Sequence, residues 1–148
     1  MKHLCLALVI AAGCGTDSSV TIATTPLAGK VAGQAWTFAA GHTSAFLSKD
    51  EPDFFASLYA MTFTACGFSE PTGPHVIAAI PKTAGDYDLS LSLNMTFTDG
   101  SNNLISTEGR IVVDEVTPTK VTGGLHAKYD ASNEVDGRFE VTVCPDTP

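Results

Sequence analysis

The chain has 148 residues, of which 16 are acidic and 8 basic, and its formal net charge is −8. This length supplies one domain with a real core, and the acidic balance without any basic cluster excludes a nucleic-acid partner, because phosphate binding needs clustered Lys and Arg. Acidity otherwise favours solubility and says nothing about fold.

The first residues have the pattern of an export signal. Lys2 and His3 precede an apolar run over residues 4–12, and small residues lead directly to Cys14. The run is too short for a helix to cross ~30 Å of hydrocarbon, whereas a basic start, a short apolar stretch and small residues before a cleavage point are typical of a signal peptide.

This leader resembles that of bacterial lipoprotein precursors. The resemblance implies that residues 1–13 are removed and that Cys14 becomes the lipidated N-terminus, with a diacylglyceryl thioether and an amide-linked acyl chain such as palmitate. Several acyl chains give a lasting anchor, since each buried CH₂ contributes ~0.8 kcal/mol. An Asp after the cysteine favours the inner membrane of Gram-negative bacteria; Gly15 stands there, so we expect the outer membrane. The alternative is an ordinary secretory signal with Cys14 as a stray thiol.

Residues 14–28 are rich in small and hydroxyl side chains, which predicts a flexible tether after the lipidated cysteine. Part of it, around residues 20–23, could instead pair as an edge strand. We expect residues 29–148 to form a single β-domain. Loss of Lys2 with the leader changes the formal net charge from −8 to −9.

The first half of this domain predicts short strands. Residues 31–40 fit two strands around Gly33 and Gln34, with Trp36, Phe38 and Ala40 alternating in the second. Residues 48–66 fit either a helix or a strand; we predict a strand over about 56–66, preceded by an acidic loop or one helical turn. Residues 76–80 predict another strand.

Strict alternation of apolar and polar residues over 87–98 predicts one long strand with one face on the core. Turn residues at 99–103 then lead to Leu104 and Ile105 as a hairpin partner. The β-branched run in 110–116 predicts a strand that ends at Pro118. Residues 121–129 and 135–143 alternate on either side of a loop at 130–134, which predicts a second hairpin.

These elements predict an all-β fold, an antiparallel meander of about 8–10 strands forming a β-sandwich or a small lipocalin-like barrel. The chain also resembles small exported β-lipoproteins of unknown activity, through Gly29, Val31, Gly33 and Trp36 near the start and residues 137–144 near the end. The resemblance implies an exported β-domain and carries over no ligand or catalytic residue.

Cys66 and Cys144 are the two cysteines left once Cys5 leaves with the leader and Cys14 carries lipid. An even pair in an exported chain predicts a disulfide, which would tie the last strand to the middle of the chain. The alternative is a nucleophilic or metal-binding thiolate, but neither cysteine has a Cys-x-x-Cys partner or a neighbouring His.

No familiar catalytic pattern occurs in the sequence, so we predict a protein that is not an enzyme and has no cofactor. His42, His75 and His126 lack the spacing of a paired metal site and are interpreted as solvated surface residues. A weak calcium-loop candidate consists of Asp130, Ser132, Glu134 and Asp136, whose alternate side-chain oxygens precede Gly137; a polar hairpin tip explains the same residues.

Three functions remain open at this point. The first is a membrane-anchored binding or structural module of the cell envelope, which presents its loops to a protein or glycan partner. The second is a lipocalin-like carrier, which predicts a dry internal cavity for an apolar ligand. The third is an envelope hydrolase, which predicts that Asp, Glu or His side chains converge in a cleft.

Overall fold

The computed structural model describes residues 20–67 and 69–145, and strands are the regular secondary structure of that part. They are β1 (Ala28–Val31), β2 (Gln34–Thr37), β3 (Ala40–Ser44), β4 (Asp53–Tyr59), β5 (His75–Pro81), β6 (Gly85–Asp88), β7 (Met95–Thr98), β8 (Asn103–Ser106), β9 (Glu108–Val116), β10 (Lys120–Asp130) and β11 (Asn133–Cys144). The predicted signal peptide, the lipidation site Cys14 and the first part of the predicted tether lie outside the described residues. Within those ranges, no helix is long and apolar enough to cross a membrane.

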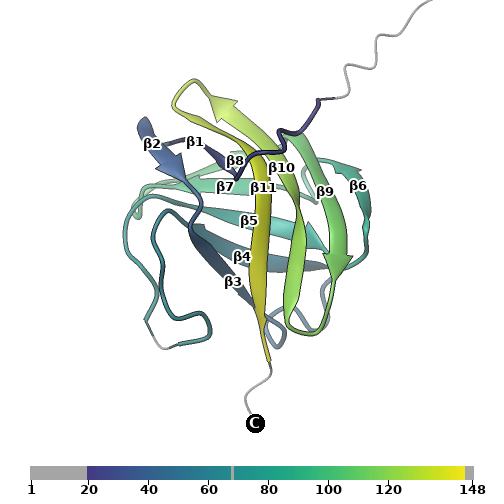
Figure 1. Cartoon of the computed structure of the whole chain (residues 1–148). Helices are drawn as coiled ribbons and strands as arrows, with labels where there is room; N and C mark the ends of the chain where they lie inside the picture. The colour runs from purple at the N-terminus through teal and green to yellow at the C-terminus, as the bar shows by residue number, and fades with distance from the viewer. Residues whose placement is uncertain (1–19, 68, 146–148) are drawn as a thin grey trace, which may run out of the picture.

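One sheet joins all these strands and curls into a half-barrel (Figure 1). Hydrogen-bonded neighbours follow the path β6-β9-β10-β11-β3-β4-β5-β7-β8, and the β1–β2 hairpin joins through β1, which pairs with β11. The strand pairs are antiparallel except β11 with β3, where Thr142 lies opposite His42 and Cys144 opposite Ser44.

The all-β prediction is confirmed, with two differences in detail. The sheet has 11 strands, and one pair is parallel. β11 and β3 are far apart in the sequence, so no hairpin forces them to be antiparallel, and a parallel pair is possible. This pair joins two groups of antiparallel strands into one sheet, β6-β9-β10-β11 on one side and β3-β4-β5-β7-β8 on the other.

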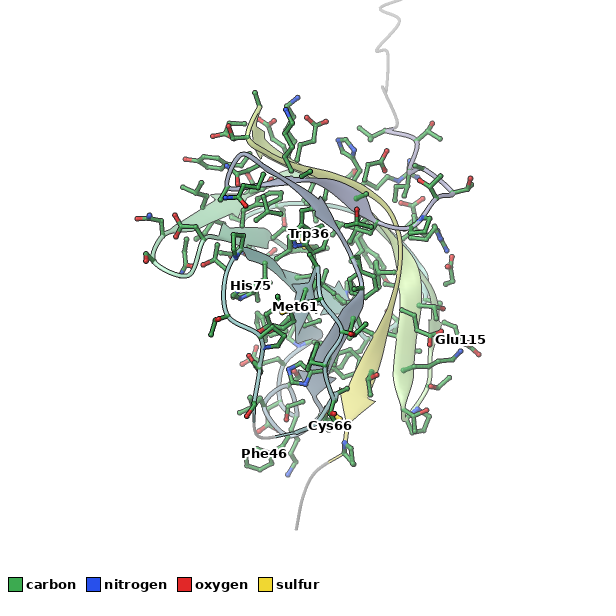
Figure 2. All side chains as sticks on the ribbon, turned by 60° about the vertical axis from the view of Figure 1, so that its left-hand side comes forward. Trp36, Phe46, Met61, Cys66, His75 and Glu115 are labelled. Carbon is green, nitrogen blue, oxygen red and sulfur yellow. A yellow bond between two sulfur atoms is a disulfide. The ribbon has the colours of Figure 1, made fainter. Side chains whose placement is uncertain are left out.

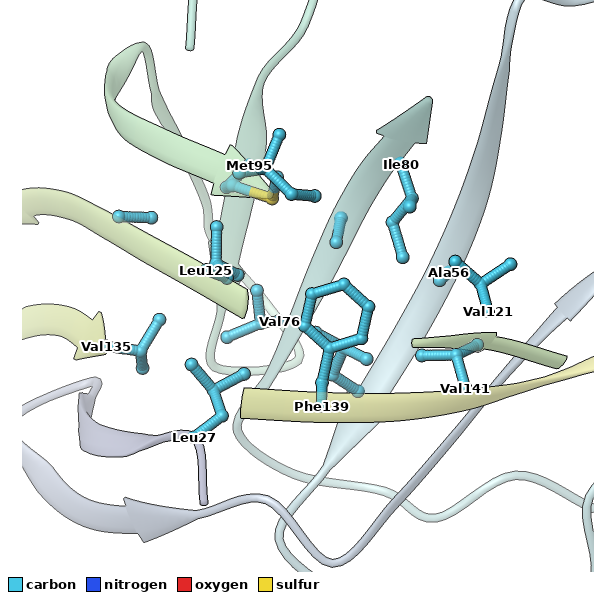
Figure 3. Close-up of a cluster of buried hydrophobic side chains, with 14 of the residues drawn as sticks. Leu27, Ala56, Val76, Ile80, Met95, Val121, Leu125, Val135, Phe139 and Val141 are labelled. Atoms are coloured by element: carbon cyan, nitrogen blue, oxygen red, sulfur yellow. The ribbon is translucent and has the colours of Figure 1, made fainter. Parts of the chain in front are cut away.

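The two sides of the curled sheet face each other across one apolar core (Figure 3). Side chains alternate inward along the strands, as a half-buried strand requires. Fully buried examples are Val76 and Ile80 on β5, which lie in the same cluster as Val121 and Leu125 on β10. The largest fully buried side chains include Phe97, Leu27, Leu58, Ile80, Met95 and Ile111.

The single long strand predicted over residues 87–98 is wrong. The segment forms β6 and β7, which pair with β9 and β5 on distant parts of the sheet. Between them the side chains of Ser90 and Asn94 bind nearby backbone groups, with Leu93 N donating to Ser90 Oγ at 3.2 Å and Asn94 Nδ2 donating to Leu91 O at 3.1 Å. Such local hydrogen bonds compete with strand pairing, and Leu91 is left 90% exposed.

The strand predicted over 56–66 is correct in type and wrong in position, because β4 spans Asp53–Tyr59 and is preceded by a turn. Its inward residues include Phe54, Ala56 and Leu58, so Phe55 lies on the outer face and is 54% exposed. Phe54 is covered by the Lys82 side chain, whose Nζ lies 5.3 Å from the ring centroid. Whether Phe54 or Phe55 points inward decides which alternate residues of β4 face the core, and the sequence pattern fits either choice.

The N-terminal part differs from prediction in where the domain begins. The first hairpin is β1–β2 with Ala32 and Gly33 in the turn, one residue earlier than predicted, and both have positive φ as such a tight hairpin requires. The predicted tether also ends before residue 28, because Leu27 is fully buried and its backbone N donates to Arg138 O at 2.8 Å.

Three other predicted elements are confirmed: the strand near 76–80 as β5, the strand over 110–116 as β9, and the C-terminal hairpin as β10–β11.

Candidate functional site

A cleft of about 250 Å³ lies where β3, β4 and the end of β11 meet the loop between β4 and β5. Its lining combines a carboxylate, an imidazole, hydroxyl groups, a disulfide and apolar side chains: His42, Thr43, Ser44, Leu47, Phe55, Ser57, Cys66, Gly67, Glu70 and Cys144. The parallel pairing of β3 with β11 brings the first and last parts of the domain together here. Polar groups converging beside apolar ones are typical of a binding site.

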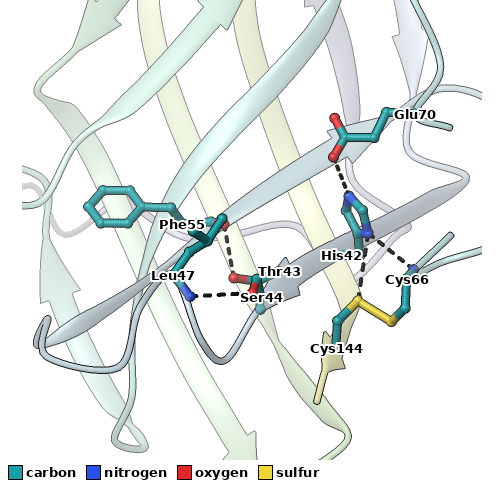
Figure 4. Close-up of a disulfide and its surroundings, with 8 residues drawn as sticks. All are labelled: His42, Thr43, Ser44, Leu47, Phe55, Cys66, Glu70 and Cys144. Atoms are coloured by element: carbon teal, nitrogen blue, oxygen red, sulfur yellow. Dashed lines mark hydrogen bonds and ion pairs between the residues drawn. A yellow bond between two sulfur atoms is a disulfide. The ribbon is translucent and has the colours of Figure 1, made fainter. Parts of the chain in front are cut away.

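A disulfide joins Cys66 in the β4–β5 loop to Cys144 at the end of β11 (Figure 4). The pairing agrees with the prediction from the cysteine count. Cys66 is exposed and has φ +63°, whereas Cys144 is half-buried beside β3. The bond holds the β4–β5 loop against the ends of β11 and β3, in the interior of the sheet, and forms one wall of the cleft.

His42, Glu70 and Tyr59 form a hydrogen-bonded chain next to the disulfide. His42 Nδ1 accepts from the backbone N of Cys66 at 3.3 Å, so Nε2 carries the hydrogen and donates to Glu70 Oε1 at 2.9 Å. The Tyr59 hydroxyl donates to the other carboxylate oxygen, Oε2, at 2.8 Å. One loop carboxylate thus links β3 and β4 and fixes the orientation of the imidazole. A Glu and a His side chain converge in the cleft, as the hydrolase alternative predicts, but both carboxylate oxygens and both imidazole nitrogens already have partners within the protein.

The ionisation of this chain follows from its contacts. Burial, helped by the hydrogen bond to Glu70, raises the pKa of the Tyr59 phenol to about 12. The hydrogen bond from Tyr59, followed by that from His42, holds the pKa of the Glu70 carboxyl below its ordinary value although partial burial opposes the shift. At neutral pH the phenol therefore remains a donor and the carboxylate remains charged.

Aromatic rings pack around the chain and support it. Phe63, from the β4–β5 loop, meets the rings of His42 and Tyr59 edge-on, with centroids 5.1 and 5.2 Å apart. His75, opposite Tyr59 on β5, lies over the Tyr59 ring at 4.8 Å. The loop is thus held by packing as well as by the disulfide. Figure 2 labels Cys66 within this loop and His75 at the start of β5.

Three exposed apolar side chains, Phe46, Leu47 and Phe55, form what we call the apolar rim of the cleft; Leu47 and Phe55 line the cleft, and Phe46 precedes Leu47 in the same turn. They are 65, 76 and 54% exposed. Phe46 and Leu47 belong to the turn between β3 and β4, and Phe55 projects outward from β4. Figure 4 shows Leu47 and Phe55 together on one side of His42 and Glu70.

The turn that carries the rim is fastened to the sheet. Ser44 Oγ accepts from Leu47 N at 3.3 Å, and the fully buried Ser48 accepts through its Oγ from Phe55 N at 3.4 Å. Lys82, from the end of β5, donates to the backbone oxygens of Ser48 and Glu51. The apolar side chains are therefore presented in a preorganised arrangement, which lowers the entropic cost of binding.

The interpretation of the three histidines as solvated surface residues is wrong for His42 and His126. The side chain of His42 is 13% exposed and lies inside the site, and that of His126 is 18% exposed and lies 3.9 Å from Asp136. His126 Nδ1 is buried without a hydrogen-bond partner within the described residues. His75 is half-buried and its Nδ1 pairs with Gly73 O at 2.9 Å.

The calcium-loop candidate forms the tip and first residues of the β10–β11 hairpin. Asp130 Oδ1 accepts from Ser132 N at 2.8 Å, Glu134 pairs with Lys128 at 3.0 Å, and Asp136 Oδ1 accepts from Ala23 N at 3.0 Å. The acidic groups thus have separate partners. In residues 20–67 and 69–145, no group of three or more His, Cys, Asp and Glu side chains is arranged to hold a metal ion.

The sequence pattern did not mark Glu70 or Leu47 as site residues. Their roles depend on a loop that folds back on β3 and on a parallel strand pair between distant segments, and neither leaves a periodic signal. The pairing of the two cysteines was the one usable signal, because it places the β4–β5 loop beside the end of β11. Comparison with protein families, curated proteins and solved structures finds no match to this chain.

Proposed function

We propose that this protein is a lipid-anchored, non-enzymatic binding module of the bacterial cell envelope, and that it binds a polypeptide partner at the apolar rim of the cleft. The observation that carries the proposal is the combination of Phe46, Leu47 and Phe55, exposed but held in place, with the fixed Glu70 carboxylate alongside. Exposed apolar groups next to one another and rimmed by polar groups mark interaction surfaces on soluble domains.

The chemistry of this surface favours a protein segment with an apolar anchor and a basic flank. Aromatic and aliphatic side chains supply most of the binding energy at protein interfaces when they are desolvated together. Around the rim the acidic residues Asp50, Glu51 and Glu70 outnumber Lys49 and Lys82, on a chain whose net charge is already −8. Complementary positive charge on the partner would speed association and select the partner.

The interior supports surface binding over the carrier alternative. A carrier of the lipocalin type holds its ligand inside the curled sheet, in an apolar cavity. Here Phe97, Met95 and Leu125 fill inward positions and are almost or completely buried in one core cluster. The cleft described above opens instead on the outer side of β4, where Phe55 points to solvent.

The lipid anchor at Cys14 supports a role on the membrane surface. It rests on the signal pattern of the leader and on Gly15, which favours the outer membrane by the lipoprotein sorting rule. A partner recognised by the domain would then be an envelope protein within reach of the anchored chain.

The test is co-purification of partners from chemically cross-linked envelopes of the producing bacterium, with the full chain as bait. The double variant Leu47→Ser/Phe55→Ser should lose the partner that the wild type retains. The matched control is Leu91→Ser/Ile105→Ser, which removes two other exposed apolar side chains, 90 and 57% exposed, and should retain the partner. Equal retention, or equal loss, in both variants at unchanged unfolding midpoints would contradict the proposal.

A further inference from the structure

We propose that the Cys66–Cys144 disulfide is a thiol–disulfide exchange site, at which a small external thiol attacks Cys66 and His42 stabilises Cys144 as the departing sulfur. This activity goes beyond the binding function and does not depend on it. The structural basis is the unequal surroundings of the two sulfur atoms.

Cys66 is the more exposed cysteine of the pair, although both line the cleft. It is exposed in the β4–β5 loop, whereas Cys144 is half-buried at the end of β11. Cys66 also has φ +63°, in the left-handed region that is costly for a residue with a Cβ. Exchange rates depend on access to the attacked sulfur, so an incoming thiolate should attack Cys66.

Cys144 is the sulfur that the protein can stabilise as a thiolate. Its Sγ lies 3.7 Å from His42 Nδ1, while Cys66 contacts the same nitrogen through its backbone N. An imidazolium beside a cysteine favours the thiolate, which makes that cysteine the better leaving group. The sulfur that is harder to attack is therefore the one better placed to leave.

Glu70 positions the imidazole and balances its charge. Its carboxylate accepts from His42 Nε2 at 2.9 Å and leaves Nδ1 directed at the disulfide. The other polar groups around this pair are the Tyr59 hydroxyl, which donates to Glu70, and His75, which stacks on the Tyr59 ring. When the hydrogen bond from Cys66 N opens, the carboxylate-bound imidazole can take up a proton at Nδ1 and pass it to the adjacent sulfur.

The reaction balances with thiols as the only co-reactant. An external thiol RSH loses its proton to solvent, and RS⁻ attacks Cys66 Sγ to form a mixed disulfide. The bond between Cys66 and Cys144 breaks, its electron pair goes to Cys144 Sγ, and that sulfur takes a proton from Nδ1 of His42, which has itself taken up from solvent the proton that RSH released. A second RSH displaces RSSR and leaves the Cys66 thiol, so two thiols are oxidised for each disulfide reduced.

The test treats the full chain, purified in detergent, with reduced glutathione for short times and traps the products with iodoacetamide. Trypsin cleaves after Lys49, Lys82 and Arg138, so Cys66 and Cys144 fall on different peptides. Mass spectrometry should find glutathione on the Cys66 peptide and the alkylated thiol on the Cys144 peptide. Glutathione on the Cys144 peptide, or reaction only after unfolding, would overturn the proposal.

The role of His42 is tested by His42→Asn. Asparagine can still accept a hydrogen bond from Cys66 N–H but cannot carry the proton. We expect the exchange rate to fall by about tenfold, the order expected for loss of one charge-assisted hydrogen bond. Glu70→Gln should slow exchange less. The control His126→Asn, at a histidine on β10, should react like the wild type. Equal rates for His42→Asn and wild type, with both folded by near-ultraviolet circular dichroism, would overturn the role of His42.

Discussion

Removal of the disulfide should destabilise the domain by a predictable amount. The change is Cys66→Ala/Cys144→Ala, which opens a link between residues 78 apart in the sequence. On the chain-entropy relation, closing a loop of that size lowers the entropy of the unfolded chain by an amount equivalent to about 4.5 kcal/mol at 25 °C. Strain and residual structure in the unfolded chain reduce such values, so we expect a loss of about 3–4.5 kcal/mol.

Little of this loss should come from packing. Cys66 is exposed and Cys144 half-buried, so alanine at both positions leaves no large cavity in the core. The β4–β5 loop keeps the two hydrogen bonds of Glu70 and the contacts of Phe63. The folded state should therefore be retained, with the change concentrated in the unfolded chain.

The assay is equilibrium unfolding in urea of the full chain in detergent. With a slope of about 2 kcal/mol per molar, the expected loss moves the midpoint down by roughly 2 M. Wild-type protein reduced before unfolding lacks the same cross-link and should share the midpoint of the double variant. An oxidised wild type that unfolds within about 0.5 kcal/mol of the variant would refute the reasoning.

Three further outcomes are expected. Cys14→Ala should move the chain from the membrane to the soluble fraction at an unchanged unfolding midpoint; continued membrane association would contradict the anchor. Because the pKa of Tyr59 rises from 10.0 to about 12 on folding, its contribution to stability should be complete below pH 10 and lost as the pH approaches 12, and Tyr59→Phe should flatten this part of a stability–pH curve. Gly109→Ala should cost about 2 kcal/mol or more, since its Cβ would lie 2.0 Å from His126 O at φ +134°. The control Gly100→Ala, at φ +93° with nothing within 4 Å, should cost only about 1 kcal/mol in chemical denaturation.

Much of the fold could be predicted because period-two alternation depends on local sequence. The β10–β11 hairpin shows this well: Val121, Leu125, Val135 and Val141 alternate inward as expected, on either side of a turn at Ala131 and Ser132. The alternation over residues 87–98 predicted one long strand, which is wrong. The pattern does not show that the side chains of Ser90 and Asn94 will form hydrogen bonds with nearby backbone groups and so compete with strand pairing.

The candidate site could not be predicted to the same extent. His42 and Glu70 meet because β3 lies parallel to β11 and because the β4–β5 loop returns over β3, and both features are contacts between distant segments. Phe55 falls in the region 48–66, where the sequence fits either a helix or a strand, and its exposure depends on which of Phe54 and Phe55 points inward. Leu47 precedes that region, and no sequence pattern marks it as a site residue. The disulfide was the exception, since an even cysteine count in a chain that we predict to be exported constrains the pairing.

The most direct test of partner binding at the apolar rim is site-specific photocrosslinking in the intact envelope of the producing bacterium. A photoreactive amino acid replaces Leu47 in one variant and Leu91 in another, positions that are 76 and 90% exposed. The proposed function predicts a discrete protein adduct from position 47 and none from position 91. The same adducts from both positions, or an adduct from position 91 alone, would contradict it.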